Sequence, residues 1–282
     1  MFARPRTIDE AVSLLGATPW SIVAGGTDFY PGLRDGPVSG SVLDISAIDG
    51  LKSIQLDGDV WRLGAGATWS DLITQELPPV FDALKLAARE IGSVQIQNRA
   101  TVVGNLCNAS PAADGVPALL ILNAEVELSS QTGKRVLPLE EFIKGNRRTA
   151  CRLDEFVTAI LIPTDATRGR SHFTKLGVRK YLIISIAMVA SRLVIDSSDC
   201  ISEAAVSVGA CSEVALRLTS LEQALLGHNA VADLRKVIVP EHFDGLQPLT
   251  DVRSSRDYRC HAARELVCRS LQLCLKPTVA AT

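Results

Sequence analysis

Several features that mark common classes of protein are missing from this 282-residue sequence. The N-terminus, MFARPRTIDEA, has no apolar segment typical of a secretory signal. The longest apolar stretch, at 182–190, meets Ser191 and Arg192 well before the roughly eighteen residues that a membrane-spanning helix needs. The formal net charge is −2 and the basic residues are scattered, which indicates no surface for nucleic acid. We therefore expect a cytoplasmic protein with no membrane span and no nucleic-acid partner.

Clustered metal ligands and known nucleophile motifs are also missing. None of the seven cysteines has a close spacing such as C-x2-C, and the four histidines are isolated. An odd number of widely spaced cysteines in a chain of this length favours free, mostly buried thiols over a disulfide framework. No G-x-S-x-G segment is present. The sequence therefore indicates no local metal site and offers little support for hydrolysis.

Hydrophobic residues make up 47% of the chain, which is enough for one large domain or two to three small ones. The polar stretch at 164–170 is the expected main boundary, and three strands spaced for an antiparallel meander follow it. The first third is rich in short strands, and Thr68 with Asp71 indicates a helix start. Helical spacing or capping patterns predict helices over 7–15, 80–91, 220–226, 230–237 and 255–274.

Two successive glycines, Gly25 and Gly26, follow the predicted strand SIVA and precede a Thr-Asp pair. Their main-chain N–H groups have no side chain beside them to keep an anion away, so this segment is a candidate anion-binding nest. A tight turn is the alternative, and it is favoured for this segment taken alone. The nearby GAGATW at 64–69 lacks the last glycine of the dinucleotide pattern G-x-G-x-x-G and is interpreted as a strand end.

A second stretch, SVQIQNRATVVGNLCNASPAAD, covers 93–114 and ends in the small-residue segment 100–114. Because it is rich in Asn, Ser and Gly, we expect a long loop, and long loops are usually functional. Two such loops would hold opposite sides of one diphosphate. Asp114 at the end of the segment is also placed to cap a following helix. Lys175 lies in a predicted strand among apolar residues, where a lysine that extends from a sheet edge to solvent is the simpler interpretation.

Five blocks in this order resemble the FAD-binding medium subunit of molybdenum-containing hydroxylases, the xanthine dehydrogenase and carbon monoxide dehydrogenase flavoprotein family. The resemblance extends from about Arg4 to about Leu275. The blocks are IVAGGTDF at 22–29, IGSVQIQNRATVVGNLCNASPAAD at 91–114, RRTACRLDEFVTAILIP at 147–163, FTKLGVRK at 173–180 and TDVRSSRDYR at 250–259.

The resemblance implies an α+β fold with two domains. The FAD-binding domain would cover 1–165 and consist of two α/β subdomains, about 1–55 and 56–165, of the vanillyl-alcohol-oxidase (PCMH) type. The C-terminal flavoprotein domain would cover 170–276, with a three-stranded antiparallel sheet and a helical bundle, and 277–282 would form a tail.

The resemblance also implies a cofactor site. FAD would lie extended, with its diphosphate between the two small-residue loops, Asp114 would bind the adenosine half, and Ile91 would pack near the cofactor. Val157 and Lys175 would lie near the flavin end, where a cation stabilises the negative charge of the reduced ring. No catalytic residue and no metal ligand is expected in this chain. The implied loop residues are Ile22, Val23, Ala24, Gly25, Gly26, Thr27, Asp28 and Phe29 in the first loop, and Ala100, Thr101, Val102, Gly104 and Asn105 in the second.

The sequence departs from the family pattern in two places. The family's second loop usually reads T-I-G-G-N, whereas Val102 and Val103 precede Gly104 here, so one glycine is lost. Gln97 stands where arginine is common, and the cysteine-rich insertion that carries an extra iron–sulfur cluster in some relatives is not present.

The function implied by the resemblance is electron transfer within a multi-subunit oxidoreductase. Electrons would come from a [2Fe-2S] subunit and pass through FAD to an external acceptor. A large molybdenum-cofactor subunit would hydroxylate an N-heterocycle or a similar small molecule, in a dimer of heterotrimers. The alternatives are a member that oxidises carbon monoxide or an aldehyde, a self-contained FAD-dependent oxidoreductase, and a structural subunit without flavin.

Overall fold

The structure is a computed structural model that describes residues 1–276; the expected tail at 277–282 lies outside the described residues. The chain forms two compact units, and each is assembled from separate segments. Two stretches of the N-terminal half, which carry α4 (Asp82–Glu90) and α7 (Gly115–Leu120), belong to the unit that holds the C-terminal half. Unit 1 consists of 1–75, 92–110 and 124–164, and unit 2 of 76–91, 111–123 and the chain from 165 onward.

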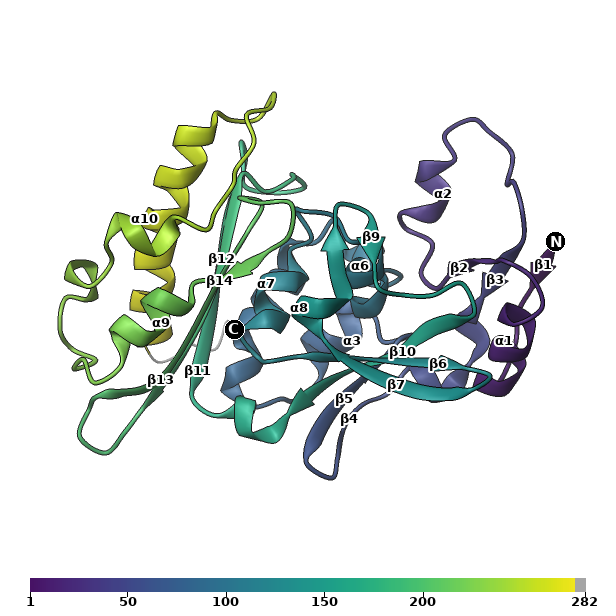
Figure 1. The fold of residues 1–282 in the computed structure, drawn as a ribbon, viewed down its shortest axis with the longest axis horizontal. Helices are drawn as coiled ribbons and strands as arrows, with labels where there is room; N and C mark the ends of the chain where they lie inside the picture. The colour runs from purple at the N-terminus through teal and green to yellow at the C-terminus, as the bar shows by residue number, and fades with distance from the viewer. Residues whose placement is uncertain (277–282) are drawn as a thin grey trace. The chain divides into compact units, whose positions relative to one another are not determined.

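Unit 1 contains a small parallel sheet, in the order β1-β3-β2, and a five-stranded antiparallel sheet, in the order β4-β5-β10-β6-β7 (Figure 1). The central strand β10 is buried along nearly its whole length, which explains its continuous apolar run. The strands of unit 1 are β1 (Phe2–Ala3), β2 (Ser21–Val23), β3 (Val42–Asp44), β4 (Ile54–Asp57), β5 (Val60–Gly64), β6 (Glu125–Ser130), β7 (Gly133–Pro138), β8 (Ile143–Gly145), β9 (Arg148–Thr149) and β10 (Glu155–Pro163).

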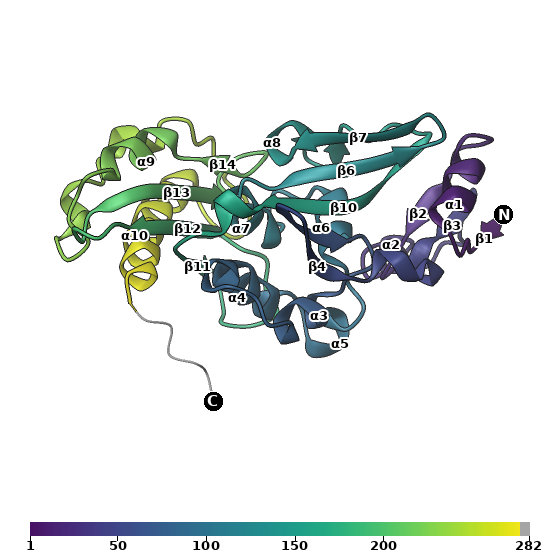
Figure 2. The ribbon, with the colours of Figure 1, turned by 90° about the horizontal axis from the view of Figure 1, so that it is seen from below.

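The helices of unit 1 begin where the sequence offers caps. The Thr7 side chain accepts a hydrogen bond from the Glu10 N–H at the start of α1, which lies beside the small sheet (Figure 2). Thr68 and Asp71 form the predicted capping box of α3. The loop expected at 93–114 was wrong in part, because two short helices lie within it. The helices are α1 (Ile8–Leu15), α2 (Phe29–Gly32), α3 (Trp69–Thr74), α5 (Val94–Gln97), α6 (Val102–Asn108) and α8 (Leu139–Phe142).

Unit 2 is built on an antiparallel sheet in the order β11-β12-β13-β14. The predicted meander of three strands is confirmed, and a fourth strand of only two residues extends it. The apolar stretch at 182–190, which is typical of a buried strand, forms one only in its second half, because β12 begins at Ala187 and Leu182 is exposed with a φ of 52°. The strands are β11 (Arg170–Leu176), β12 (Ala187–Ile195), β13 (Ile201–Gly209) and β14 (Leu216–Arg217).

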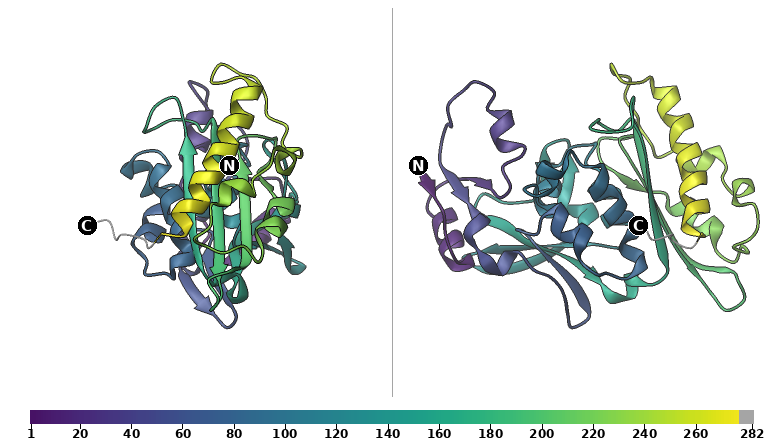
Figure 3. Two further views of the ribbon diagram at one scale, coloured as in Figure 1. Left: turned by 90° about the vertical axis from the view of Figure 1, so that its left-hand side faces the viewer. Right: turned by 180° about the vertical axis from the view of Figure 1, so that it is seen from behind.

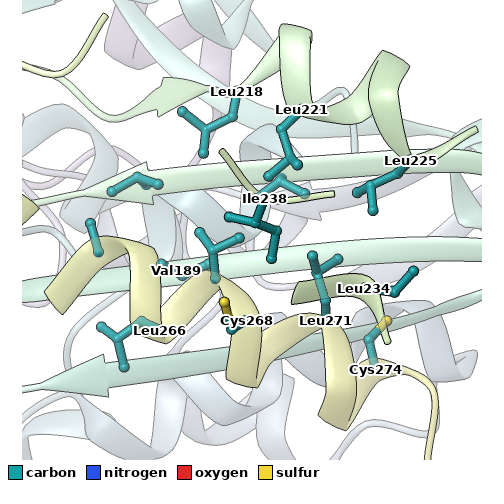
Figure 4. Packing of buried hydrophobic residues seen from close by; sticks show 14 of the residues in the cluster. Val189, Leu218, Leu221, Leu225, Leu234, Ile238, Leu266, Cys268, Leu271 and Cys274 are labelled. Carbon is teal, nitrogen blue, oxygen red and sulfur yellow. The ribbon is translucent and has the colours of Figure 1, made fainter. Parts of the chain in front are cut away.

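Helices cover both faces of this sheet (Figure 3). The helices α9 (Thr219–Leu225) and α10 (Arg256–Cys274) lie on one face, and α4 and α7 lie on the other. Figure 4 shows the core under α9 and α10, where Val189 of β12 meets Leu221, Leu266 and Leu271. The helix predicted at 230–237 was wrong, because this stretch holds only the 3-10 turn Leu234–Lys236.

Candidate functional site

The first small-residue segment, 22–29, connects β2 to α2 in unit 1. Gly26 has a φ of +74°, a left-handed conformation that favours glycine. Among the described residues, no main-chain or side-chain oxygen accepts a hydrogen bond from the N–H groups of Gly25 through Phe29. Most of this turn is only partly covered by protein. A run of unpaired main-chain donors in a turn of this kind suits an anionic ligand.

Gly25 is in close contact with the second segment. A Cβ atom on Gly25 would lie 1.9 Å from the main-chain oxygen of Arg99 and 3.0 Å from the Cα of Ala100. The sequence predicted that the main chain is closely approached here, and the resemblance implied a diphosphate as the approaching group. In the structure the group next to Gly25 is the neighbouring main chain, so the glycine is required by the packing of the two segments.

The second segment, 100–105, is the start of helix α6 and not an open loop. Thr101 is the N-cap, and its Oγ1 accepts a hydrogen bond of 2.9 Å from the Gly104 N–H. A Cβ on Gly104 would lie 2.8 Å from that oxygen, so glycine preserves the cap. The side chain of Val103 is only 4% exposed. The lost glycine has therefore been replaced by a residue whose side chain packs inside the protein.

The stretch Ala67–Trp69 supports this second segment. The Trp69 N–H donates to the Ala100 oxygen at 3.1 Å, and the Val102 N–H donates to the Ala67 oxygen at 3.0 Å. From its sequence this stretch is interpreted as a strand end, and no motif in it indicates a connection with the site. The Trp69 side chain is fully buried, which explains why a large aromatic residue follows the GAGAT segment.

The implied loop residues differ in exposure. Val23, Ala100, Thr101 and Val102 are buried, so we expect them to reach a ligand only through their main chains. Ile22 and Asp28 are exposed. Partly exposed residues of the two segments are Ala24, Gly25, Gly26, Thr27, Phe29, Gly104 and Asn105.

Asp114 and Lys175 form a buried ion pair in unit 2. The Lys175 Nζ lies 2.6 Å from the Asp114 Oδ2, and both side chains are at least nine-tenths covered. The Ser185 hydroxyl donates to the other carboxylate oxygen at 2.6 Å. Burial raises the pKa of Asp114, while the charge and hydrogen bond of Lys175 and the hydroxyl of Ser185 oppose the rise.

This contact corrects two expectations. Asp114 occupies the N-cap position of α7, as predicted, but its side chain makes no capping hydrogen bond there. Lys175 is buried and paired, so it does not extend to solvent from a sheet edge. The implied contacts of Asp114 and Lys175 with the cofactor stay a prediction, in which two side chains that form one ion pair would act together.

The two remaining implied residues lie in different units. Ile91, partly exposed, is the C-cap of α4 in unit 2. Val157 is 4% exposed on the central strand β10 of unit 1, next to an irregularity in its pairing with β6. Neither side chain is brought into the Asp114–Lys175 pair.

Three residues of these sites were missed by sequence reasoning. Arg99 contributes only its main chain, which no side-chain pattern reveals. Trp69 stands in a segment without a recognisable motif, and Ser185 lies in an apolar stretch where one hydroxyl carries no signal. In each case the partner is distant in the sequence, so only the folded chain shows the contact.

Within residues 1–276, no group of three or more His, Cys, Asp or Glu side chains is arranged to hold a metal ion. Across the same residues, no helix has the length and apolar character required to cross a membrane.

The residues of unit 1 fit the diphosphate of a dinucleotide. The N–H donors from Gly25 to Phe29 have no acceptor within residues 1–276. The second segment packs directly against Gly25, and hydrogen bonds of Trp69 and the Thr101 cap hold it in place. A diphosphate needs several hydrogen-bond donors that carry no bulky side chain, and this turn supplies them.

Comparisons with known proteins agree with this fit. Residues 1–165 match the FAD binding domain in molybdopterin dehydrogenase, and residues 172–273 match the CO dehydrogenase flavoprotein C-terminal domain. A nicotinate dehydrogenase FAD-subunit from Eubacterium barkeri is 30% identical over 266 residues, which cover 92% of this chain and 90% of the relative. A xanthine dehydrogenase FAD-binding subunit from Escherichia coli O157:H7 is 29% identical, with the same coverage of 92% and 90%.

A solved structure shows the same fold. It is a carbon monoxide dehydrogenase from Hydrogenophaga pseudoflava that lacks the Mo-pyranopterin moiety of its molybdenum cofactor, with a TM-score of 0.84 and 26% identity. The match covers 96% of this chain and 95% of that one. The chain therefore belongs to the family of FAD-binding medium subunits of molybdenum hydroxylases, and it is an oxidoreductase subunit with an α+β fold.

Proposed function

We propose that this chain carries FAD as the electron-transfer group of a molybdenum hydroxylase, between a [2Fe-2S] subunit and an external acceptor. The observation that carries the proposal is the turn from Gly25 to Phe29, whose main-chain donors find no acceptor in the described part of the chain and which packs on the residues just before α6. When bound, FAD supplies reversible redox chemistry that no side chain of the protein provides. The protein groups therefore bind and tune the cofactor.

Within this proposal, the two segments of unit 1 hold the diphosphate through main-chain N–H groups. Asp114 and Lys175 of unit 2 are proposed as further contacts of the same cofactor, and they act together because they form one ion pair. A lysine whose charge is held by a carboxylate has a weaker effect on a nearby ring than an isolated cation. Val157 and Ile91 are proposed as apolar contacts.

The substrate of the assembly is proposed to be an N-heterocycle or a similar small molecule. Nicotinate and xanthine, for which two relatives are named, are both N-heterocycles. Relatives named for carbon monoxide and glyceraldehyde mark the alternative. The proposed partners are a large molybdenum-cofactor subunit and a small iron–sulfur subunit, in a dimer of heterotrimers.

Purification of the tagged chain from its own cells tests the assembly. The proposal expects bound FAD together with two further polypeptides, one with molybdenum and one with iron and sulfide. FAD with substrate oxidation by this chain alone would indicate a self-contained oxidoreductase, and a colourless complex would indicate a structural subunit.

Reconstitution with different ligands tests the diphosphate site directly. Apoprotein is titrated with FAD, with FMN and with ADP, and binding is followed by flavin fluorescence or calorimetry. Because FMN lacks the diphosphate bridge and the adenosine, FAD should bind at least about 100-fold more tightly, and ADP should compete. Equal affinities for FAD and FMN would contradict the proposed role of the two segments.

A further inference from the structure

A buried arginine on α10, Arg259, connects the segments that surround the Asp114–Lys175 pair. Arg259 is 4% exposed. Its Nη1 donates to the main-chain oxygens of Ile186, at 2.5 Å, and Ala210, at 3.0 Å. Its Nη2 donates to the Asp251 carboxylate at 2.8 Å. The guanidinium thus joins α10 to three separate parts of unit 2.

The two carbonyl groups belong to the chain segments that place Asp114. Ile186 follows Ser185, whose hydroxyl donates to the Asp114 carboxylate. The Ala210 N–H donates to the oxygen of Pro111 at 3.1 Å, and Pro111 lies in the short turn that ends at Asp114. Arg259 therefore holds the residue next to the Ser185 donor and, through Ala210, the turn that leads to Asp114.

Lys175 is connected to the same group of contacts. The Ile186 N–H donates to the oxygen of Leu176, the next residue after Lys175, at 2.7 Å. The peptide groups around Ile186 thus link Lys175 on β11 with the carbonyl held by Arg259.

The chemistry of the site favours arginine over other large side chains. Two carbonyl oxygens and a carboxylate converge here, and their partial negative charges repel unless a cation with donors in a fixed plane lies between them. The Arg259 Nε has no partner among the described residues, which is unfavourable for a buried donor. An arginine that leaves one donor unsatisfied is poorly explained by stability alone.

We infer that Arg259 is a positioning residue that sets the geometry of the Asp114–Lys175 pair through Ser185 and the main chain at Ile186 and Ala210. The inference rests on the proposal that this pair contacts the cofactor. It assigns a role to the TDVRSSRDYR segment, which the proposed function otherwise leaves unused. Arg259 itself makes no contact with the reacting group.

The test compares Arg259→Met and Arg259→Lys in the full chain. FAD affinity and the flavin midpoint potential are measured together with the melting temperature. Arg259→Met should weaken FAD binding about five- to tenfold, because its effect reaches the Asp114–Lys175 pair only through the residues that lie between them. Arg259→Lys should recover part of that loss, because the charge remains. If Arg259→Met is not recovered folded, Asp251→Asn is used in its place, because Asp251 is the carboxylate partner of Arg259. Asp251→Asn should also weaken FAD binding, by a smaller factor than that expected for Arg259→Met.

Arg192→Met is the matched control. Arg192 is also buried and also donates to a carbonyl, of Ile121, and to a carboxylate, of Glu203. Ile121 lies at the end of α7 opposite to Asp114, and among the described residues no hydrogen bond joins Arg192 to Ile186 or Ala210. Arg192→Met should lower the melting temperature and leave FAD affinity and midpoint potential unchanged. Equal changes in FAD affinity for Arg192→Met and Arg259→Met would overturn the inference, because both would then reflect general loss of stability.

A double-mutant cycle with Ser185→Ala identifies the route. If Arg259 acts through Ser185, the double variant should bind FAD more tightly than the product of the two single effects predicts, and both single variants should shift the potential in the same direction. Strictly multiplicative effects would contradict this route.

Variants of the ion pair distinguish failure of the proposed function from failure of the inference. If Asp114→Asn and Lys175→Met leave FAD binding unchanged, the proposed contact between the pair and the cofactor fails. If they weaken FAD binding while Arg259→Met does not, only the positioning role of Arg259 fails.

Discussion

Arg62 on β5 reaches across the central strand β10 and forms a two-pronged ion pair with Glu127 on β6. The two guanidinium-to-carboxylate distances are 2.6 and 2.9 Å. Thr158 of β10, between them, donates to the same carboxylate. Burial alone would raise the pKa of Glu127, but the hydrogen bonds from Arg62 and Thr158 and the charges of Arg62 and Lys134 lower it to about 2. The pair therefore stabilises the five-stranded sheet of unit 1 in its ionised form.

Replacing Glu127 with glutamine should destabilise the chain by roughly 2–4 kcal/mol at neutral pH, because the Arg62 charge would stay largely buried without a counter-charge. A group with a lowered folded-state pKa contributes its full stability above the unfolded pKa, about 4.5, and loses it as pH falls toward about 2. The difference between wild type and Glu127→Gln in urea unfolding should therefore narrow as pH falls below about 4.5. Glu140→Gln, at an exposed position, should have little effect at any pH. A constant difference across this range would contradict the assignment of the ionised form.

Much of the fold could be predicted because its elements are repetitive. The spacing of the strands predicted the meander of β11 to β13, and helical spacing predicted α1 and α10. The failures have a common cause, which is that short elements depend on tertiary contacts. Helices α5 and α6 have four and seven residues, and β14 has two, so none is long enough to show a period.

The candidate site was predicted in part for a different reason. Local composition correctly indicated that small residues at Gly25 allow a close approach, but it did not reveal that the approaching group is Arg99. Lys175 and Asp114 are separated by 61 positions, so their ion pair depends on how β11 and α7 come together in unit 2. Sequence patterns report what a segment tolerates, whereas its partner is determined by the folded chain.

Gly25→Ala should weaken both FAD binding and stability. The added methyl group would meet the Arg99 main chain at 1.9 Å, and a main-chain atom has little freedom to move away. We expect FAD affinity to fall at least about tenfold and the free energy of unfolding to fall by about 1–3 kcal/mol, as for other overpacked sites. The measurements are FAD titration and urea unfolding of the apoprotein.

Gly32→Ala is the control for this substitution. Gly32 ends the neighbouring helix α2, and no atom outside its immediate chain neighbours lies within 4 Å of a Cβ at that position. Its FAD affinity should match that of the wild type. If Gly25→Ala binds FAD normally and unfolds at the wild-type urea concentration, the packing of the two segments is not what requires the glycine.

The thiols of Cys211 and Cys274 should resist alkylation in the folded protein. Burial raises the pKa of each to about 12, and only the thiolate reacts readily. Iodoacetamide at pH 8 followed by peptide mass spectrometry should find both unmodified, and both should react in urea. Cys200, which is only partly buried, serves as the internal comparison. Rapid modification of Cys274 in the native chain would show that α10 separates readily from β11.

Lys175→Met should lower the flavin midpoint potential, because the substitution removes the positive charge that we propose to lie near the reduced ring. It should also destabilise the chain by about 3–5 kcal/mol, since Asp114 would remain buried without its counter-charge. Its carboxyl would then take up a proton more readily, because burial already raises its pKa. The double variant Asp114→Asn/Lys175→Met removes both charges and should recover most of the lost stability while the potential changes less than in Lys175→Met alone. Potentiometry and urea unfolding of the wild type, the two single variants and the double variant separate the two effects. If the changes in unfolding free energy of the two single variants add up to that of the double variant, the ion pair is contradicted. An unchanged midpoint potential in Lys175→Met would contradict the proximity of Lys175 to the flavin.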